Sequence, residues 1–489
     1  FTLYLLFLLL LAALDKYNMI LNEGKPVKKQ TLTKIAMLVA ASAAMNVSAA
    51  DLTSVTKTAI ENNPEVQTQW FSFLEATANQ KQARAGYLPS LDLNAAYGKG
   101  NREFDGDRGW FNQGQAEIAL TQVLFDGFRI KSKVEQGDYA ALKRYYDLNA
   151  GIEQKALEAT QAYLDVQRYR ELVGLAEGNF ANHQRVYNQV LQRTNQGVGN
   201  KADLSQITGR LSLAQTNLMT EQANLNDVSA RFARIVGVEP SNNLSPVSIN
   251  AALPNSAQEV IASAYNNNNS LKAALSEMQY ARASAQEFKA NMYPKLSFVA
   301  RTGLYQNRNS FDERSNPDND KYGQDSAVEL RLNYNLFNGF ADRAAMNAAN
   351  ARVSLSNDLK NKACVDIRQT STVAYNNVNN YTNQLQWLQR HRDESASVVK
   401  AYNDQFDIGR RTLLDVLDSE NEAFQANRAY VTTQYDLKVA QFQTLYSMGQ
   451  LLPALGIQRD NLPAVSDVSQ REINAANMCS ATVQAQAAE

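Results

Sequence analysis

The chain has 489 residues with a formal net charge of −1, and it contains only 22 glycines and 10 prolines. The balanced charge argues against a nucleic-acid-binding protein, and the scarcity of glycine and proline favours long helices over a sandwich or an α/β enzyme. His183 and His391 fall in helical stretches without metal-ligand spacing, and we find neither a nucleophile motif nor a glycine-rich phosphate loop. We therefore expect a protein that is not an enzyme and that uses no metal and no cofactor.

Residues 1–50 are predicted to form a signal region that is cleaved. Four lysines precede an apolar run at residues 35–45, and Ser48 and Ala50 supply the small residues expected before a cleavage at Asp51. Residues 1–18 lie upstream of Met19 and are interpreted as a start-site artefact. The alternative interpretation is an N-terminal membrane anchor.

The cysteines are compatible with export. Cys364 and Cys479 are the two cysteines of the chain, and their pattern indicates neither a disulfide scaffold nor a zinc site. The sequence leaves their role open. The residue directly after the predicted cleavage site is Asp51 and not a cysteine, which argues against a lipid anchor on the mature N-terminus.

The chain repeats itself after the signal region. The segment Leu-Phe-Asp-Gly-Phe at residues 124–128 returns as Leu-Phe-Asn-Gly-Phe at residues 336–340, an offset of 212 positions. Three later pairs keep this offset: Gly197 with Gly409, Asp203 with Asp415, and Gly237 with Gly449. The earlier prolines, Pro89 and Pro294, are 205 positions apart. The seven extra residues of the second copy therefore belong to a loop between these marks.

Each copy has the same predicted elements in the same order. A helix at residues 52–86, or 257–292, is followed by two alternating segments and then by a long helix at 128–196, or 340–408. After a short break, a last helix runs over 201–236, or 413–448. A long helix of this length spans roughly 100 Å, which matches the two shorter helices of its copy placed end to end. We expect the shorter helices to stack in this way beside the long one.

The alternating segments are predicted to be strands. Apolar and polar residues alternate strictly at residues 328–336, and the same pattern occurs at 91–97 and 296–300. Each strand is expected to have about ten residues, the length that a tilted membrane strand needs. Four strands cannot close a barrel in lipid, so this interpretation requires several copies, and a trimer gives twelve strands. The alternative is a soluble hairpin packed on helices.

These elements define the expected domains. We assign residues 51–237 to the first repeat and residues 257–452 to the second. The linker at 238–256 and the C-terminal segment with its flexible tail at 453–489 are predicted to form an equatorial belt at mid-height. The predicted fold class is mainly α with a β-barrel part, built from two structural repeats of long coiled-coil helices and a two-strand hairpin.

Two turns end the long helices. Gly197 and Gly409 occupy the position where a left-handed residue reverses the chain, and Asn200 and Thr412 are good N-caps for the next helices. Asp203 and Asp415 are expected to stabilise the first turns of these helices. The loop of Gly197, Val198 and Gly199 is a candidate contact for a partner protein, with a plain turn as the alternative.

Asp418 lies beyond the first turn of its helix. Its repeat counterpart is Gln206, so the repeat does not require an acid here. Asp415 and Asp418 are three residues apart and share a helix face. In a trimer they would form two rings of carboxylates that favour cations and bind multivalent cations as blockers. The alternative for Asp418 is a solvated helix surface.

With its repeated segments, its prolines before the strands and its tip residues in combination, the sequence resembles the TolC family of outer-membrane efflux proteins. The residues that carry the resemblance are Leu88-Pro89 and Tyr293-Pro294 before the first strands, the repeated segments at 124–128 and 336–340, and the tip at residues 406–418. The similarity runs from about residue 51 to residue 456. The strand–helix junctions of the family correspond to these positions: Pro89, Phe125, Gly127, Pro294, Phe337 and Gly339.

The resemblance implies a homotrimer in the outer membrane with a twelve-stranded barrel and a periplasmic helical tunnel. It also implies partners: a periplasmic adaptor (membrane fusion) protein and an inner-membrane ABC or RND pump, with no nucleic acid. The cargo would be proteins, through type I secretion, or small toxic compounds. The missing lipid-anchor cysteine slightly favours the branch of protein-secretion and general-purpose channels. The alternative function is a periplasmic coiled-coil adaptor or structural protein without its own channel.

The resemblance also assigns roles at the tip. Asp415 and Asp418 match the aspartates of the entrance constriction, and Arg411 and Asp203 match a polar link that holds the closed state. Phe406 stands where the best-known members have Tyr. The lost hydroxyl hydrogen bond would cost about 0.5–1.5 kcal/mol, so we expect a closed state that is held more loosely.

Overall fold

The computed structural model describes residues 51–104, 107–249, 252–306, 322–458 and 462–469, together with residues 471, 473, 475, 478 and 479. All of them belong to one unit, residues 50–489. The predicted signal region lies outside the described residues, and so does the segment 307–321, where the second copy was expected to have its longer loop.

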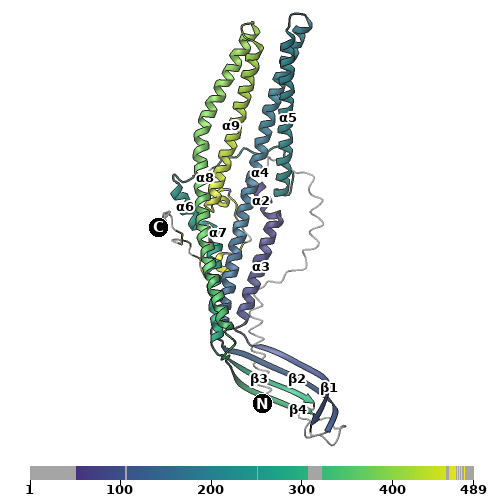
Figure 1. Ribbon diagram of the computed structural model, residues 1–489, viewed down its shortest axis with the longest axis vertical. Coiled ribbons are helices and arrows are strands. Elements are labelled where there is room, and N and C mark those ends of the chain that lie inside the picture. The colour runs from purple at the N-terminus through teal and green to yellow at the C-terminus, as the bar shows by residue number, and fades with distance from the viewer. Residues whose placement is uncertain are drawn as a thin grey trace. The chain divides into compact units, whose positions relative to one another are not determined.

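Apart from a short 3₁₀ helix in the second copy, the two copies contain the same elements in the same order (Figure 1). The first has α2 (Leu52–Asn62), α3 (Pro64–Ala85), β1 (Ser90–Phe104), β2 (Asp107–Phe125), α4 (Arg129–Asn195) and α5 (Lys201–Val236). The second has α6 (Ala257–Asn267), α7 (Asn269–Lys289), η1 (Ala290–Met292), β3 (Lys295–Gln306), β4 (Tyr322–Asn333), α8 (Ala341–Asp407) and α9 (Leu413–Ser447). The short helices α10 (Leu451–Ala454) and α11 (Val465–Val468) follow.

The first helix of each copy is two helices, not the single one predicted. Asn63 ends α2 in an extended conformation, and its side chain accepts a hydrogen bond from the backbone N–H of Glu65 to cap α3, with Pro64 in the first turn. Asn268, which is 205 positions later, caps α7 in the same way. The Asn-Pro pair of the first copy was the signal for this break, because Asn favours the N-cap and Pro the first helical position.

The helices stack as predicted. The long helices α4 and α8 have 67 residues each, or roughly 100 Å. Beside α4, the amide of Asn63 donates a hydrogen bond to the carbonyl of Ile235, which joins the end of α2 to the end of α5. The hairpins α4–α5 and α8–α9 have their turns at the end of the unit opposite the strands (Figure 1).

The four strands form one antiparallel sheet in the order β1-β2-β3-β4. Leu91 faces Leu120 in the first hairpin, and Leu296 faces Leu332 in the second. The two hairpins therefore have the same register once the offsets of 205 and 212 are applied. The strands have 15, 19, 12 and 12 residues, so they are longer than the ten predicted. A bulge between Val123 and Phe125 shifts the register of β2 against β3.

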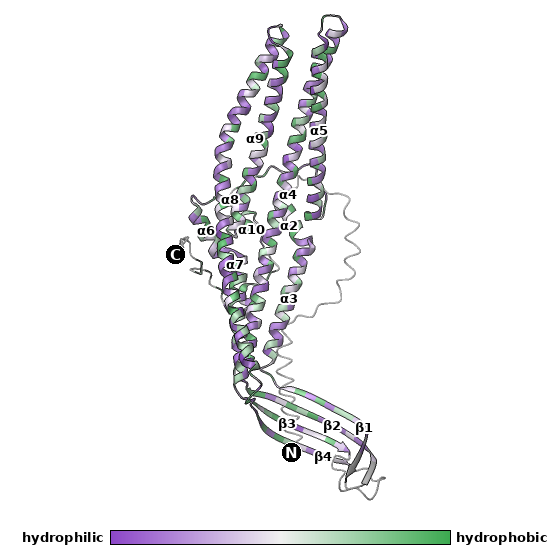
Figure 2. Ribbon diagram, viewed as in Figure 1, coloured by the Kyte–Doolittle hydropathy of each residue, from purple (hydrophilic) through white to green (hydrophobic). Residues whose placement is uncertain are grey.

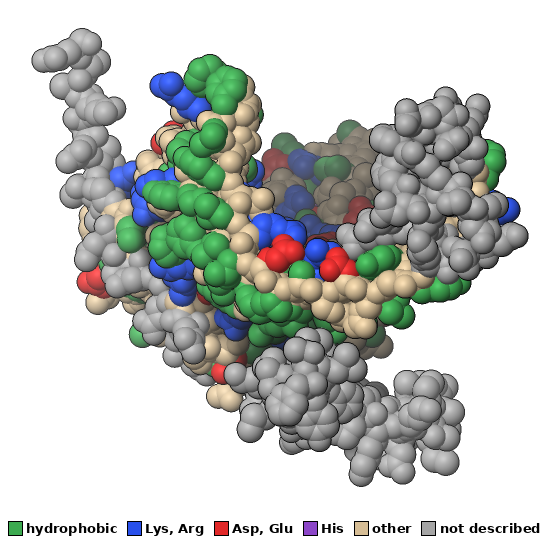
Figure 3. Space-filling model, turned by 90° about the horizontal axis from the view of Figure 1, so that it is seen from below, with side chains coloured by type: hydrophobic (Ala, Val, Ile, Leu, Met, Phe, Trp, Pro, Cys, Tyr) green, Lys and Arg blue, Asp and Glu red, His purple; other side chains and the backbone are tan. Residues whose placement is uncertain are grey.

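The sheet has one apolar and one charged face. From the strand end, apolar side chains gather on its outer side, and Arg and carboxylate side chains gather in its hollow (Figure 3). The exposed apolar residues include Leu93, Tyr97, Val328, Leu330 and Leu332. On the other face, Arg301 lies within 3.2–3.4 Å of Glu117, Asp325 and Glu329. The sequence predicted this alternation, which places apolar side chains on one face of the sheet and polar side chains on the other.

The core lies around the middle of α4. Tyr163, Leu164 and Val166 are fully buried there, against Phe232 of α5 and Leu445 of α9. The equivalent helix α8 buries far fewer side chains, because α4 is flanked by helices of both copies. Polar and apolar residues are interspersed along all the long helices (Figure 2). Among the described residues, no helix is both long and apolar enough to cross a membrane.

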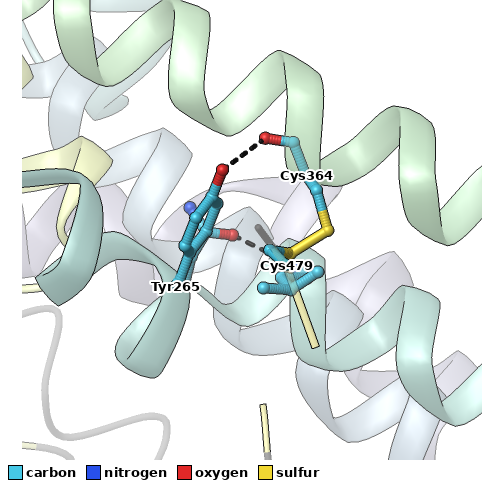
Figure 4. Close-up of a disulfide and its surroundings, with 5 residues drawn as sticks. Tyr265, Cys364 and Cys479 are labelled. Carbon is cyan, nitrogen blue, oxygen red and sulfur yellow. Dashed lines mark hydrogen bonds between the residues drawn. A yellow bond between two sulfur atoms is a disulfide. The ribbon is translucent and has the colours of Figure 1, made fainter. Parts of the chain in front are cut away.

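The C-terminal segment crosses from the first copy to the second. The side-chain amide of Gln80 donates to the carbonyl of Val468, and Arg471 pairs with Asp138 of α4 at 3.2 Å. Cys479 then forms a disulfide with Cys364 of α8 (Figure 4). The sequence did not predict this bond, because the two cysteines are 115 positions apart and belong to no motif.

Candidate functional site

The first tip joins α4 to α5. Gly197 adopts a left-handed conformation with φ of 79°, and the N–H groups of Val198 and Gly199 both donate to the carbonyl of Arg193. The side chain of Asn200 then accepts a hydrogen bond from the N–H of Ala202 and caps α5. The turn and the cap are formed as predicted, and they leave the Val198 side chain 78% exposed at the end of the hairpin.

The second tip joins α8 to α9 with the same design. Gly409 has φ of 74°, and the N–H of Arg410 donates to the carbonyl of Gln405. Thr412 and Asp415 form a capping box, in which the carboxylate of Asp415 accepts from the backbone N–H of Thr412. The capping role predicted for Asp415 is thus confirmed.

A small apolar cluster joins the two tips. Val186 and Ile207 of the first hairpin are buried against Leu413 and Leu417 of the second, with Phe406 packed against them. The guanidinium of Arg193 lies 5.4 Å from the centre of the Phe406 ring. Phe406 was predicted to lack the hydrogen bond that a Tyr hydroxyl would make. In the structure its ring contributes apolar and cation–π contacts instead.

The predicted link between Arg411 and Asp203 is not formed in this conformation. Arg411 lies over the ring of Tyr402 at 4.2 Å, donates to the side chain of Gln405 at 2.9 Å, and lies 3.8 Å from Asp415. All three partners belong to the hairpin of Arg411 itself. Asp203 lies in the first turn of α5, as predicted.

A different ion pair joins the two hairpins. A guanidinium nitrogen of Arg210, on α5, lies 2.6 Å from a carboxylate oxygen of Asp418, on α9. Asp418 was predicted to be a free ring-forming carboxylate or a solvated surface residue, and here it is held by a cation. Sequence reasoning missed Arg210, although an arginine on one tip helix and an unrepeated aspartate on the other were visible signals.

Two further ion pairs join the hairpins below the tips. Glu221 of α5, which is 3% exposed, lies 2.7 Å from Arg428 of α9. Arg168 of α4 lies 2.9 Å from Asp436 of α9. Together with the Arg210–Asp418 pair they form a series along α9, which we call the ion-pair ladder. The ladder holds α9 to the first hairpin from the tip to mid-height.

A buried acid lies between the first and second pairs of the ladder. Glu420 of α9 is 6% exposed, and its carboxylate oxygens make no hydrogen bond with the described residues. Burial raises the pKa of Glu420, and His183 and Arg185 of α4 oppose the shift. His183 is itself 3% exposed. The sequence analysis did not identify Glu420, and it considered His183 only as a metal ligand.

The strand–helix junctions repeat in detail. Gly127 and Phe128 are left-handed in the first copy, as are Gly339 and Phe340 in the second. The rings of Phe125 and Phe128 meet edge to face, and so do those of Phe337 and Phe340. Pro89 and Pro294 precede β1 and β3 directly. The predicted junction residues therefore turn the chain between sheet and helix.

A family model described as outer membrane efflux protein matches residues 55–238 and 260–449. The chain belongs to the outer membrane efflux protein family. It is 22% identical over 415 residues to the outer membrane efflux protein BepC of Brucella suis biovar 1, covering 83% of this chain and 87% of BepC. It is 22% identical over 420 residues to the outer membrane protein TolC of Escherichia coli, covering 82% and 83%. The alkaline protease secretion protein AprF of Pseudomonas aeruginosa is 22% identical over 410 residues, covering 80% and 83%.

Solved structures agree with the fold. The outer-membrane channel OprN superposes with a TM-score of 0.72 at 18% identity, covering 82% of this chain and 90% of OprN. The outer membrane protein VceC of Vibrio cholerae superposes with a TM-score of 0.70 at 15% identity, covering 81% and 96%. This member of the outer membrane efflux protein family is thus an export channel protein of the outer membrane with a long periplasmic helical part. Proteins of this family are channels rather than enzymes.

Proposed function

We propose that three copies of the chain close a twelve-stranded barrel in the outer membrane, continued by a periplasmic tunnel of helices. The tunnel receives proteins or small toxic compounds from an inner-membrane ABC or RND pump through a periplasmic adaptor protein. The observation that carries the proposal is the sheet. It has a lipid-compatible apolar face and two open edges, which a membrane does not tolerate.

The open edges are β1 and β4. Among the described residues, β1 pairs only with β2, and β4 pairs only with β3. Inside the chain, β2 of the first copy pairs with β3 of the second, so the repeat itself provides a template for the missing contact. Because β4 is equivalent to β2 and β1 is equivalent to β3, β4 of one chain should pair with β1 of the next.

The template also sets the register. Leu120 of β2 faces Ala300 of β3. Adding 212 to the first position and subtracting 205 from the second places Leu332 opposite Ala95 of the next copy.

The helices support the same arrangement. The helix α4 packs against α7 of the other repeat, whereas its equivalent α8 carries exposed apolar side chains, Leu355 and Leu359 among them.

Cysteine cross-linking tests the proposal. The double variant Leu332→Cys and Ala95→Cys should form covalent trimers in outer membranes under non-reducing conditions. The matched control combines Leu332→Cys with Asn94→Cys, whose side chain points to the other face of the strand, and should remain largely uncross-linked. Covalent dimers alone, equal cross-linking of both variants, or recovery of the protein in the soluble periplasmic fraction would contradict the proposal.

The cargo is proposed at the level of two classes. The relatives include the alkaline protease secretion protein AprF and the outer membrane efflux protein BepC. Deleting the gene and comparing the secretome with drug sensitivity separates the two classes. Loss of an exported protein with unchanged drug sensitivity would indicate type I secretion, and the reverse would indicate efflux.

The tips are proposed as the adaptor contact and the entrance. The exposed Val198, with Gly197 and Gly199, forms the end of the first hairpin, and Ile408 beside Gly409 is 66% exposed at the second. Such exposed aliphatic tips suit capture by a coiled-coil partner. Val198→Asp should reduce co-purification of the adaptor without changing the yield of trimer, and Val198→Ala should retain it.

The entrance constriction is proposed to contain Asp415 and Asp418. Arg411 contacts Asp415 and not Asp203, so the ion pair that joins the two hairpins near the tips is Arg210–Asp418. Asp415→Asn combined with Asp418→Asn should reduce the cation selectivity of the purified channel in planar bilayers. Unchanged selectivity would place the constriction elsewhere.

A further inference from the structure

We propose that Arg210 is a positioning residue of the tunnel entrance. Its guanidinium holds Asp418 against the first hairpin in the closed tunnel, neutralises that carboxylate there, and frees it when the two hairpins of a subunit separate. The inference rests on the proposed channel function and adds to it a residue that sets both the closure and the charge of the entrance.

The geometry of the pair supports a specific role. The nitrogen–oxygen distance is 2.6 Å, as in charge-assisted hydrogen bonds. The side chain of Arg210 is 29% exposed and that of Asp418 is 57% exposed, so the pair lies at the surface of the hairpins and not inside their core. Asp415, the other proposed entrance acid, is occupied by its capping box. In this conformation both entrance carboxylates are therefore engaged, and Asp418 is the one paired with the opposite hairpin.

The repeat shows that helix packing alone does not require this pair. The position equivalent to Arg210 in the second copy is Glu422, and the position equivalent to Asp418 in the first copy is Gln206. If the junction between neighbouring subunits resembles the junction inside one subunit, it brings Glu422 near Gln206 of the next copy. The ion pair then exists only inside the subunit, although the helices repeat around the whole tube.

The other two ion pairs of the ladder also have no ionic equivalent at the repeat-related positions. In each, both charged residues become neutral polar residues at the equivalent positions. Glu221 and Arg428 correspond to Thr433 and Thr216, and Arg168 and Asp436 correspond to Asn380 and Asn224. All three ionic contacts are thus confined to the junction between the two hairpins of one subunit. The pair of Arg210 with Asp418 is the one that includes a proposed entrance residue.

Removing the guanidinium should have two separate effects. The hairpins lose an ionic contact near the tip, so the closed state is held less firmly. Three carboxylates per trimer also lose their counter-charge at the entrance, so the channel becomes more selective for cations and is blocked by lower concentrations of a trivalent cation. A residue with a merely structural role would change the first property but not the second.

Conductance of purified trimers in planar bilayers tests the inference, with La³⁺ as the blocking probe. Arg210→Gln should raise the opening frequency by about threefold to a hundredfold, the range expected when three exposed ion pairs are lost. It should also raise the ratio of cation to anion permeability and lower the La³⁺ concentration for half-block. Asp418→Asn should raise the opening frequency but lower both cation selectivity and La³⁺ block. The exchanged pair, Arg210→Asp with Asp418→Arg, should restore a low opening frequency.

The matched control is Arg428→Gln, which breaks an ion pair of the same ladder farther from the entrance. It should leave the permeability ratio and La³⁺ block of the wild-type channel unchanged. If the wild-type trimer conducts and Arg210→Gln is indistinguishable from it in both properties, the inference is wrong. A wild-type protein that forms no conducting trimers would instead overturn the proposed function, and the inference with it.

Discussion

Cys364 of α8 and Cys479 of the C-terminal segment form a disulfide that covalently joins the end of the chain to the second repeat. The hydroxyl of Tyr265 on α6 donates to the carbonyl of Cys364 at 3.2 Å (Figure 4). Ala475 belongs to the same apolar cluster as Tyr265 and Cys364. Upstream of the bond, Arg471 is held by Asp138 and Glu135 of α4. The segment is therefore fixed at both ends, on helices of different repeats. A stable disulfide is expected in an exported protein, since reducing compartments do not maintain it.

Breaking the disulfide should loosen this segment. Cys479→Ser is expected to lower the free energy of unfolding by about 2–4 kcal/mol, because the closed loop is long, and to expose the residues after 458 to protease. Limited proteolysis and thermal unfolding of the purified protein measure both effects. Cys364→Ser should behave identically, and reductant should affect the wild type but neither variant. Equal protease resistance of wild type and variants would contradict a tethering role.

Replacing the junction glycine Gly127 should affect the folding of the subunit, whereas replacing Gly339 should affect the assembly of the trimer. A Cβ at Gly127 would lie 2.7 Å from the carbonyl oxygen of Ala290 and 2.8 Å from Cβ of Tyr293, whereas a Cβ at Gly339 meets no heavy atom of the described residues within 4 Å. Both positions have positive φ, which costs an L-residue roughly 1–2 kcal/mol.

Gly127→Ala should therefore lower the yield of folded subunit. Gly339→Ala should leave the subunit folded but reduce trimer formation, because the proposed junction places the next copy where Ala290 lies beside Gly127. The ratio of trimer to folded monomer during refolding measures the difference. Identical behaviour of the two variants would argue against an equivalent junction between copies.

Phe406→Tyr should make the closed state firmer. The ring already contacts Arg193 and the apolar tip cluster, and an added hydroxyl that finds a partner is worth about 0.5–1.5 kcal/mol. Opening frequency in planar bilayers should fall. Tyr402→Phe, which removes a hydroxyl one turn away and keeps the ring over Arg411, is the matched control. An unchanged opening frequency in Phe406→Tyr would exclude the looser closed state inferred from the sequence.

The stability of the hairpin junction should depend on pH through Glu420. Burial raises the pKa of this carboxyl above its ordinary value of 4.5, so the folded protein binds the proton more tightly than the unfolded chain. The stability contributed by protonation is complete below 4.5 and is lost as the pH rises through the raised pKa. His183 and Arg185 of α4 and Asn403 of α8 are the polar groups that face it and limit the shift.

Glu420→Gln should remove this dependence and stabilise the junction at neutral pH. Thermal unfolding or hydrogen exchange of α9, measured between pH 4 and pH 8, compares the variant with wild type. Glu422→Gln, a change of the same kind one half-turn along α9, should keep the wild-type profile. A wild-type stability that does not fall over this range would show that Glu420 is not buried as a charge.

Much of the fold follows from local patterns. The long helices lie within a residue of their predicted limits, because their ends are marked by Gly197 and Gly409 and by the N-caps Asn200 and Thr412. The breaks at Asn63 and Asn268 were missed although the cap chemistry was visible, because a helical pattern continues on both sides. Strand lengths were underestimated, because the alternation fades toward the loops before pairing ends.

By itself, the sequence determined the two repeats, the helix lengths, the alternating strands and the left-handed turns, since each depends on residues that are neighbours along the chain. The tertiary structure alone decided that Cys364 bonds Cys479, that Arg411 stays within its own hairpin, and that Arg210 pairs with Asp418. The disulfide and the ion pair join positions 115 and 208 apart, so they depend on how distant segments approach and how the helices rotate. No local pattern specifies that rotation, which is set by the packing of the whole helical bundle.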